Sequence, residues 1–549
     1  MQLTDNKYFS EYDAKMTAKY QFDIINKTLL IDRNNELISL EFIQQFDISN
    51  LTITDCEQIE PKLNSETIKK LTINHCKLQN LDGFNLENLE ILRLYSNFQL
   101  AYENVNKFKQ LKELELSAVN CEDISCLESM QQLKRLNLYI NKVKDISVLK
   151  QLVNLTDLNI SANAGVNITP LQYMVQLTKL NMSWTNFMNV SVLEHLVNLE
   201  ELYMAQNGRI LDISPLQYLV KLAKLDLSSN KLKDISIISK LEKLTVLSLS
   251  QNEGVDISPL LNMTQLTYLN LSSCKLQSIS YVERLVNLEY LDLSANVGIE
   301  IQPLQHLIKL TSLNLENCGI ISLVPIQQLV NLVELNASDN AGLQIQPLQY
   351  LVGLVKLKLN DNELTDISYL KTLVNLEELS LNINKQIYNI SPLQYLTKLT
   401  ILQLYHCGIY EISALRPLTN LKELNLSKNQ ITNVYPLKEL SQIKHLNLWH
   451  NYVYDFSALE KNPNYNSFTL DYQKLPSEEE QFYADRMRII DIILSQLRQL
   501  RIMHICSKQS TIQRQKNENY HIKQAHLHLL RFTKIIASLY SILNTETTQ

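Results

Sequence analysis

Two arrangements of residues in the chain could in principle bind a metal ion. Cys121 and Cys126 form a Cys-x4-Cys pair, and His521, His526 and His528 lie close together near the C-terminus. Cysteine and histidine are the usual zinc ligands. However, Cys121 takes a position that other repeats give to a core leucine. Histidines five and two residues apart do not share one helical face, where neighbours are three or four apart. We therefore expect no metal site and no cofactor.

Carboxylates that could serve as a general acid and base are also present, but their setting argues against catalysis. Glu113 and Glu115 alternate along an expected strand, so both side chains lie on one face, and a solvated surface explains them. The sequence has no Gly-x-Gly-x-x-Gly, Walker, His-Glu-x-x-His or Cys-x-x-Cys motif. No nucleophile has a predictable base partner beside it. We therefore expect no enzyme.

The elements that must position these residues come from an internal repeat of 22 residues. Leu133–Val143 has the pattern Leu-x-x-Leu-x-Leu-x-x-Asn-x-Val. Its Leu-x-Leu alternation has the period of a β-strand, and stacked units of this kind build a solenoid. The regular units begin at 89, 111, 133, 155, 177, 199, 222, 244, 266, 288, 310, 332, 354, 376, 399, 421 and 443. Looser units begin near Ile48 and Ile68, which gives about 19 repeats.

Position nine of the unit is expected to hold the turn after the strand. It is Asn in 12 of the 17 regular units, and the Asn amide can hydrogen-bond neighbouring backbone groups, so that stacked repeats form an asparagine ladder. Cysteine replaces it in other units, where we expect a small buried turn residue. These cysteines are Cys56, Cys76, Cys274, Cys318 and Cys407.

The second half of each unit is too short for a full α-helix. The pattern Asp-Ile-Ser-x-Leu-x-x-Leu, as in Asp234–Leu241, predicts a 3₁₀ turn or an extended segment on the convex side. Proline recurs every 44 or 45 residues, at 170, 215, 259, 303, 347 and 392. This longer period indicates that a two-repeat module was copied.

The pattern Leu-x-x-Leu-x-Leu-x-x-Asn-x-Ile/Leu-x-Asp-Ile-Ser-Pro-Leu resembles the 22-residue leucine-rich repeat of bacterial internalins. It is also similar to the repeats of intracellular phosphatase-regulatory leucine-rich-repeat proteins and of expanded families in diplomonad protists. The resemblance covers about residues 45–460. It implies an α/β fold, a right-handed curved leucine-rich-repeat solenoid with a parallel concave sheet, and protein binding on the concave face.

The ends of the chain are expected to form caps and a tail. Apolar residues at Tyr8, Tyr12 and Met16 have helical spacing and predict an N-terminal helix over Thr4–Tyr20. The expected domains are an N-terminal helical cap with an opening unit (1–45), the solenoid (46–460), a C-terminal cap (461–476) and a tail (477–549). The stretch Leu470 to Ala484 resembles the C-terminal cap of intracellular leucine-rich-repeat proteins.

The tail contains two amphipathic helical stretches, over about residues 478–508 and 520–543, joined by a polar link. They predict a C-terminal α-helical hairpin or a coiled coil. The helices could pack on the last repeat or on each other, form a homodimer, or bind a partner helix.

Binding is expected at concave positions three, five, seven and eight. The middle of this face is mostly Asn and Ser, which contribute little binding energy, whereas Trp, Tyr and Arg contribute most. Larger side chains gather toward both ends of the solenoid. The candidate protein-binding residues are Arg93, Tyr95, Tyr139, Ile140, Trp184 and Tyr203 toward the N-terminus, and Tyr405, His406, His445, Trp449 and His450 toward the C-terminus.

Composition also indicates which classes of partner and which cellular location to expect. A net charge of −6 disfavours a nucleic-acid binder, because such proteins neutralise phosphates with lysine and arginine. No apolar run approaches the length of a membrane span. The first residues show no basic start followed by an apolar core, and eight cysteines in 549 residues are no disulfide framework. We expect a cytoplasmic protein.

The sequence thus predicts a non-enzymatic scaffold or adaptor that binds a protein partner, whose identity it does not reveal. Three alternatives remain open, namely a phosphatase-type regulatory subunit, an internalin-like adhesin and a self-assembling structural protein.

Overall fold

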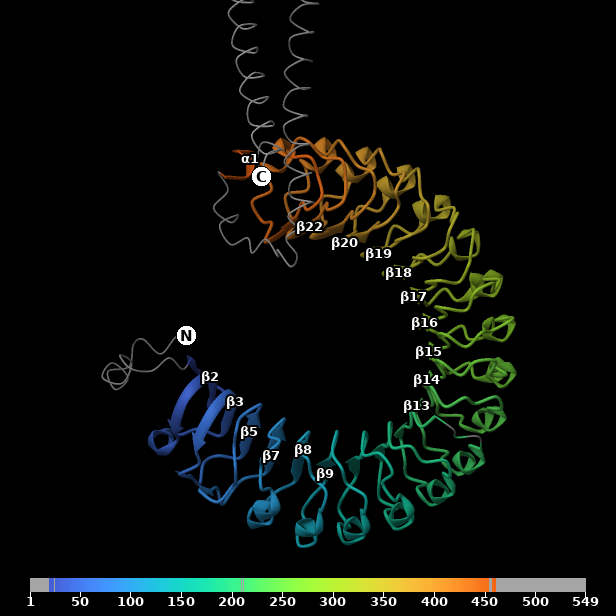
Figure 1. Cartoon of the computed structure of the whole chain (residues 1–549). Helices are drawn as coiled ribbons and strands as arrows, with labels where there is room; N and C mark the ends of the chain where they lie inside the picture. The colour runs from blue at the N-terminus through green and yellow to red at the C-terminus, as the bar shows by residue number, and fades with distance from the viewer. Residues whose placement is uncertain (1–18, 24, 209, 211, 454–456, 461–549) are drawn as a thin grey trace, which may run out of the picture. The chain divides into compact units, whose positions relative to one another are not determined.

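The computed structural model describes residues 19–23, 25–208, 210, 212–453 and 457–460. The chain divides into two compact units, residues 1–451 with 457–468, and residues 452–456 with 469–549. Nearly all described residues belong to the first unit, a solenoid of stacked repeats (Figure 1). The expected cap at 461–476 and the helical tail lie outside the described residues.

The solenoid presents one β-strand per repeat. From β9 onward the strands are short, because each covers only positions three to five of its unit. The strands are β1 (Lys19–Asp23), β2 (Thr28–Ser39), β3 (Asn50–Glu60), β4 (Leu63–Asn64), β5 (Lys70–Asn74), β6 (Phe84–Asn85), β7 (Ile91–Tyr95), β8 (Glu113–Ser117), β9 (Arg135–Asn137), β10 (Asp157–Asn159), β11 (Lys179–Asn181), β12 (Glu201–Tyr203), β13 (Lys224–Asp226), β14 (Val246–Ser248), β15 (Tyr268–Asn270), β16 (Tyr290–Asp292), β17 (Ser312–Asn314), β18 (Glu334–Asn336), β19 (Lys356–Lys358), β20 (Glu378–Ser380), β21 (Ile401–Gln403), β22 (Glu423–Asn425) and β23 (His445–Asn447).

Twenty-one of these strands form one sheet, and β4 and β6 form a second, parallel pair. In the main sheet β1 is antiparallel to β2, and the later pairs are parallel and in register, as in Leu269 with Leu291. Each strand position therefore stacks on the same position of the next repeat. The sheet lines the inner side of the curved unit (Figure 1), which confirms the predicted parallel concave sheet.

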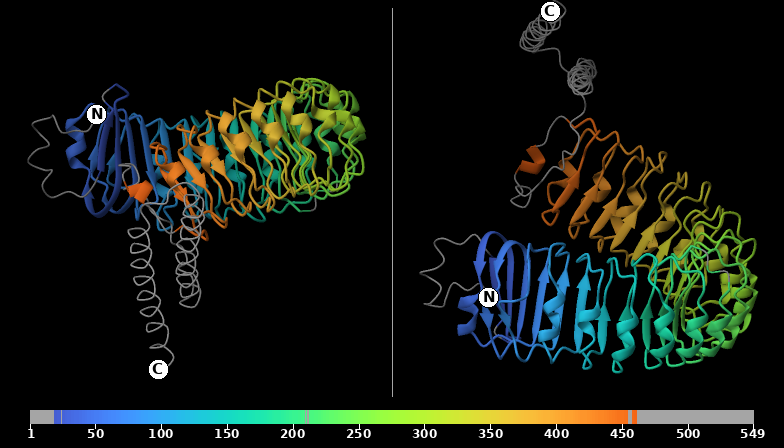
Figure 2. Two further views of the ribbon diagram at one scale, coloured as in Figure 1. Left: turned by 90° about the horizontal axis from the view of Figure 1, so that it is seen from above. Right: turned by 60° about the horizontal axis from the view of Figure 1, so that its bottom comes forward.

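The opposite side carries short 3₁₀ helices, as predicted (Figure 2). They are η1 (Glu41–Gln45), η2 (Glu103–Lys107), η3 (Ser125–Leu127), η4 (Ser147–Gln151), η5 (Thr169–Tyr173), η6 (Ser191–His195), η7 (Ser214–Tyr218), η8 (Ser236–Lys240), η9 (Ser258–Asn262), η10 (Ser280–Val282), η11 (Gln302–His306), η12 (Val324–Ile326), η13 (Gln346–Tyr350), η14 (Ser368–Thr372), η15 (Ser391–Tyr395), η16 (Ser413–Leu415) and η17 (Tyr435–Leu437), and one α-helical turn follows, α1 (Ser457–Glu460). The Asp-Ile-Ser motif starts many of them, because the Asp carboxylate accepts a hydrogen bond from the backbone N–H two residues later. For example, the Ser236 N–H donates to the Asp234 carboxylate at 2.8 Å.

Each repeat fills the interior with seven apolar side chains. In the unit that begins at Leu133 these are Leu133, Leu136, Leu138, Val143, Ile146, Leu149 and Leu152, none more than 1% exposed. Burial of one such side chain contributes roughly 1.5–3 kcal/mol. The five position-nine cysteines are buried as predicted, and Cys121 is fully buried in a core position.

The predicted asparagine ladder is present at position nine. The Asn362 side-chain oxygen accepts the backbone N–H of Asn340 at 2.7 Å, and its amide donates to the Ala337 carbonyl at 2.9 Å. A cysteine thiol supplies the donor half of this arrangement in other units, as in Cys318, whose Sγ donates to the Leu293 carbonyl at 3.2 Å.

A second ladder, which the sequence interpretation missed, runs along the opposite edge of the repeats. There an asparagine amide donates to a main-chain carbonyl of the preceding repeat at 2.8–3.0 Å. Its members are Asn88, Asn154, Asn198, Asn287, Asn331, Asn375 and Asn420. Lysine side chains add further hydrogen bonds to this ladder. For example, Lys309 Nζ donates to Asn287 Oδ1 at 2.7 Å.

Position eight adopts a left-handed backbone conformation in all 17 regular units, with φ between +49° and +66°. This turn aims the following position-nine side chain into the interior. None of these residues is glycine, and the set includes Ile140, Trp184 and Ile383, although β-branched residues rarely adopt positive φ. The conformation is thus imposed by the stacked ladder rather than by local preference.

The N-terminal helix predicted over Thr4–Tyr20 lies outside the described residues, except for Lys19 and Tyr20, which belong to strand β1. In the described part of the chain, no helix is long and apolar enough to cross a membrane.

Candidate functional site

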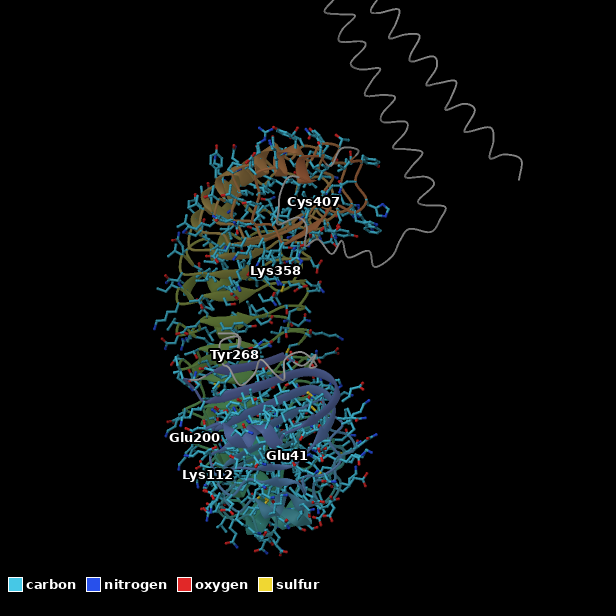
Figure 3. All side chains as sticks on the ribbon, turned by 90° about the vertical axis from the view of Figure 1, so that its left-hand side faces the viewer. Glu41, Lys112, Glu200, Tyr268, Lys358 and Cys407 are labelled. Atoms are coloured by element: carbon cyan, nitrogen blue, oxygen red, sulfur yellow. The ribbon has the colours of Figure 1, made fainter. Side chains whose placement is uncertain are left out.

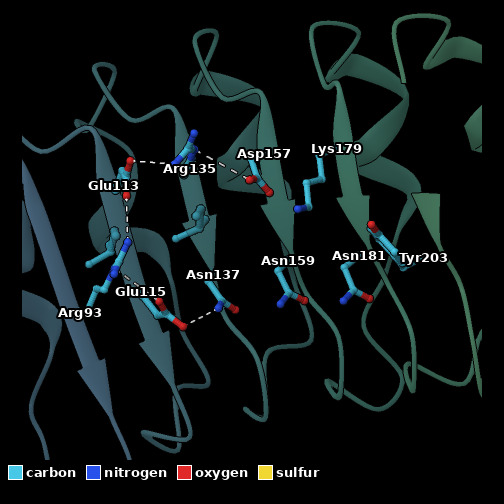
Figure 4. Close-up of a pocket in the computed structure, with 12 residues that line it drawn as sticks. Arg93, Glu113, Glu115, Arg135, Asn137, Asp157, Asn159, Lys179, Asn181 and Tyr203 are labelled. Atoms are coloured by element: carbon cyan, nitrogen blue, oxygen red, sulfur yellow. Dashed lines mark hydrogen bonds and ion pairs between the residues drawn. The ribbon is translucent and has the colours of Figure 1, made fainter. Parts of the chain in front are cut away.

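Toward the N-terminus, the concave face carries a row of alternating charges at position three, which we call the charge row (Figure 4). In-register stacking places each of these side chains beside the next, so like charges would repel and alternation is favourable. The charge row consists of Glu113, Arg135, Asp157, Lys179, Glu201 and Lys224.

Ion pairs connect the charge row. Arg135 lies 3.0 Å from Glu113 and 3.9 Å from Asp157. Farther along, Glu201 lies 2.8 Å from Lys224 and 3.2 Å from Lys179. The hydrogen bond from Lys224 lowers the pKa of Glu201 to about 2, whereas burial raises the pKa of Asp157 despite its cationic neighbours. Glu113, which we interpreted as a solvated surface residue, is therefore an ion-pair partner, and the row neutralises its own charge.

Three of the predicted N-terminal binding residues join this network. Arg93 lies 3.3 Å from Glu113, and the Tyr95 hydroxyl donates to Glu115 at 2.8 Å. The Tyr203 hydroxyl donates to Glu201 at 3.0 Å. Burial raises the pKa of both Tyr95 and Tyr203 to about 12.

Arg93 and Tyr203 line a shallow recess of about 380 Å³ together with four members of the charge row, Glu113, Arg135, Asp157 and Lys179. Their polar groups already have partners, so a ligand would have to displace bonds that the sheet makes with itself.

The remaining N-terminal candidates are exposed and lie where the strands end. Tyr139, Ile140 and Trp184 are 43%, 46% and 58% exposed. Tyr139 and Ile140 occupy adjacent positions of one repeat, whereas Trp184 lies two repeats later. They offer mainly apolar surface, with the Tyr139 hydroxyl and the Trp184 indole N–H as polar groups.

The middle of the concave face is polar for a structural reason. The position-five Asn or Asp side chain accepts the backbone N–H of position seven at 2.9–3.2 Å, which closes the end of the strand. Two large side chains in this middle region pack on each other. Tyr268 (labelled in Figure 3) stacks on Tyr290 with ring centres 4.2 Å apart and planes 4° apart.

The C-terminal end of the concave face differs. The structure places two of the predicted residues there, Tyr405 and Trp449, around a lysine that the sequence interpretation missed, Lys428. Its ammonium lies 5.4 Å from the centre of the Tyr405 ring and 5.6 Å from that of Trp449, within the range of a cation–π interaction. We call the C-terminal cluster the set Tyr405, His406, Lys428, His445, Trp449 and His450.

Two histidines pack against the aromatic rings of the C-terminal cluster. The His406 ring meets that of Tyr405 edge-on at 5.9 Å, and the His450 ring meets that of Trp449 at 3.9 Å. His445 and His450 are exposed, and Trp449 is 44% exposed. A large aromatic surface is thus held in place yet open to a ligand.

Lys428 also differs from the lysines of the charge row in its electrostatic partners. Among the described residues, no carboxylate lies within ion-pair distance of its ammonium. Its position between His406 and His450 at position eight was a signal in the sequence, but only the side-chain geometry shows that it joins Tyr405 to Trp449.

The described part of the chain contains no group of three or more His, Cys, Asp or Glu residues that could hold a metal ion. Cys121 is buried and Cys126 is partly buried, and desolvation raises the pKa of these thiols to about 11 and about 12. The histidines at 521, 526 and 528 lie outside the described residues.

Comparison with known proteins identifies the repeat. The family model of leucine-rich repeats, in two copies, matches residues 220–262, 397–439 and 419–461. The chain is a leucine-rich-repeat protein. A solved leucine-rich-repeat protein of Leptospira interrogans has the same fold, with 24% identity over 66% of this chain and 91% of that chain, and a TM-score of 0.54.

This leucine-rich-repeat protein is internalin-like in its repeat. An internalin of Listeria monocytogenes is 30% identical over 54% of this chain and 82% of that chain, with a TM-score of 0.44. The functional domain of a second Listeria monocytogenes internalin, which includes a cysteine ladder, is 20% identical over 64% of this chain and 72% of that chain, with a TM-score of 0.41. No curated protein sequence matches the chain.

Proposed function

We propose that this leucine-rich-repeat protein is a scaffold that binds a protein partner on its concave face, through the C-terminal cluster. The fold itself suggests protein binding, since stacked repeats present an extended surface and leucine-rich-repeat proteins are generally non-enzymatic binding proteins. The choice of face and of cluster is our own proposal.

The observation that carries the proposal is the placement of Tyr405 and Trp449 on either side of Lys428. Aromatic side chains concentrate binding energy because they bury a large area with few rotatable bonds. Here the cation between them restricts both rings before a partner arrives, so less conformational entropy is lost on binding.

The contrast with the N-terminal end supports this choice. Arg93, Tyr95 and Tyr203 already make hydrogen bonds or ion pairs within the sheet. A partner that used them would have to replace those bonds, whereas Trp449 presents open aromatic surface.

Affinity capture from a lysate, with the full-length chain as bait, tests the proposal. The Trp449→Ser variant should lose its partner, because truncation of a central aromatic residue weakens binding by about 30-fold or more. The matched control is Tyr350→Ser, which removes an aromatic side chain of similar exposure, 55%, from the 3₁₀ helix η13 on the opposite side. Equal capture by both variants would contradict the proposal.

A further inference from the structure

Position eight forms a row along the C-terminal repeats, in which three successive units place His406, Lys428 and His450. Their φ angles are +54°, +53° and +55°, so the three side chains leave equivalent backbone positions. Neighbouring strands of a sheet lie about 4.8 Å apart, and the row therefore presents three nitrogen-bearing side chains within about 10 Å.

The aromatic rings fix the central member of this row. The Lys428 ammonium lies between Tyr405 and Trp449, and no hydrogen bond ties its three N–H donors to an acceptor among the described residues. A ring face attracts the cation without consuming its donors. The ammonium is therefore held in place while its hydrogen-bonding capacity stays free.

Three other lysines of the concave face differ from Lys428 because each has a carboxylate partner. Lys179, Lys224 and Lys356 each lie within 3.3 Å of a glutamate on an adjacent strand. Position eight is acidic in two earlier units, at Asp339 and Asp361, and uncharged in the other earlier regular units. Within the described residues, Lys428 therefore has no ion-pair partner, and its neighbours at position eight are both histidines.

We propose that the C-terminal cluster binds a carboxylate of an acidic protein segment, with the Lys428 ammonium as its counter-ion and His406 and His450 on either side. The inference rests on the proposed function and names the chemistry of the partner. A carboxylate accepts charge-assisted hydrogen bonds from an ammonium, and the side-chain methylenes of a Glu-rich segment can pack on the exposed ring of Trp449.

The two tryptophans of the chain make a direct test possible. In a full-length Trp184→Phe background, Trp449 is the single tryptophan and reports on the cluster. We would titrate this protein with an N-acetylated, C-amidated hexaglutamate peptide, with hexaglutamine as the neutral probe. We expect a saturable change in fluorescence with hexaglutamate that weakens as salt is added, and no saturation with hexaglutamine.

Two lysine variants in the same background separate the site from general attraction. Lys428→Gln should weaken hexaglutamate binding at least tenfold. Lys358→Gln removes an exposed concave lysine at position five (labelled in Figure 3) and should leave binding unchanged. Equal weakening by both variants, or no response to hexaglutamate up to millimolar concentration, would overturn the inference.

The capture experiment separates this inference from the proposed function. If Trp449→Ser loses its partner but hexaglutamate does not bind, the cluster recognises a protein without an acidic segment, and only the inference fails. If hexaglutamate binds through Lys428 but capture does not depend on Trp449, the proposed function fails. Circular dichroism of Lys428→Gln should match the parent protein, and a changed spectrum would overturn the claim that Lys428 acts on the ligand rather than on the fold.

Discussion

The side-chain oxygen of Asn384 accepts the backbone N–H of Asn362, one repeat earlier, at 3.0 Å. The same oxygen accepts the N–H of Leu364 at 3.0 Å, and the amide donates to the carbonyls of Leu359 and Leu381 at 2.8 Å each. One fully buried side chain thus joins two repeats through three hydrogen bonds, and the bond to Leu381 stays within its own repeat.

We predict that Asn384→Ala destabilises the solenoid by about 2–4 kcal/mol, because it leaves several buried backbone groups without partners. Urea denaturation followed by circular dichroism measures this as a lower midpoint. The adjacent Lys385→Ala changes an exposed side chain and should leave the midpoint unchanged. A midpoint for Asn384→Ala equal to that of the wild type would show that the ladder does not stabilise the stack.

Relief of backbone strain at position eight should raise stability. Ile140 has φ +53° and is 46% exposed, so it combines an unfavourable conformation with little burial. We expect Ile140→Asn to stabilise the protein by about 0.5–1 kcal/mol, because asparagine tolerates the left-handed region. Val153→Asn, at an exposed site without positive φ, is the control and should give no gain in thermal stability.

The charge row should make stability depend on pH. The pKa of Glu201 falls from 4.5 to about 2 in the folded chain. The stabilisation by this carboxylate is therefore fully present above pH 4.5 and is lost as the pH falls toward 2. The Glu201 side chain is 23% exposed, and its pairs contribute on the order of 1 kcal/mol.

We accordingly predict that Glu201→Gln is less stable than the wild type at pH 7, and that the difference disappears near pH 2. Thermal unfolding across this range measures it. Glu253→Gln removes an exposed carboxylate that pairs with Lys275 at 2.7 Å and should have no measurable effect. A difference that stays constant from pH 7 to pH 2 would contradict the assignment.

The buried position-nine cysteines should be unreactive in the folded protein. Burial raises the pKa of Cys274 and Cys318 to about 11 and that of Cys407 to about 12, so little thiolate is present at pH 8. Iodoacetamide should modify these thiols in urea but not in native buffer, as peptide mass spectrometry can show. Rapid native modification of all three would mean that the repeats open locally or are packed differently.

Most of the fold could be predicted because one repeat determines it. The leucine pattern of one unit, Leu133, Leu136 and Leu138, predicts its strand. Because the same pattern recurs in each unit, stacking of the units gives the parallel register and the asparagine ladder. The left-handed position eight could not be predicted, because residues such as Ile140 and Trp184 do not favour positive φ and only the stack imposes it.

The candidate site was less predictable, because its contacts join side chains of different repeats. Position three reads Glu113, Arg135 and Asp157 in successive units, and this alternation could have revealed the charge row. Position-five asparagines, interpreted as a polar surface, instead close the strand ends. The contact of Lys428 with two rings depends on side-chain geometry that no single unit encodes. The eleven candidate binding residues remain predictions.

Site-specific photo-crosslinking tests the central claim most directly. A benzoylphenylalanine residue replaces Tyr405 in the C-terminal cluster, or Tyr350 on the opposite side, and the full-length chain is irradiated in lysate. We predict a covalent adduct with a protein partner from position 405, absent from position 350 and lost when Lys428→Gln is added. Adducts from position 350 alone, or equal adducts from both positions, would contradict recognition on the concave face.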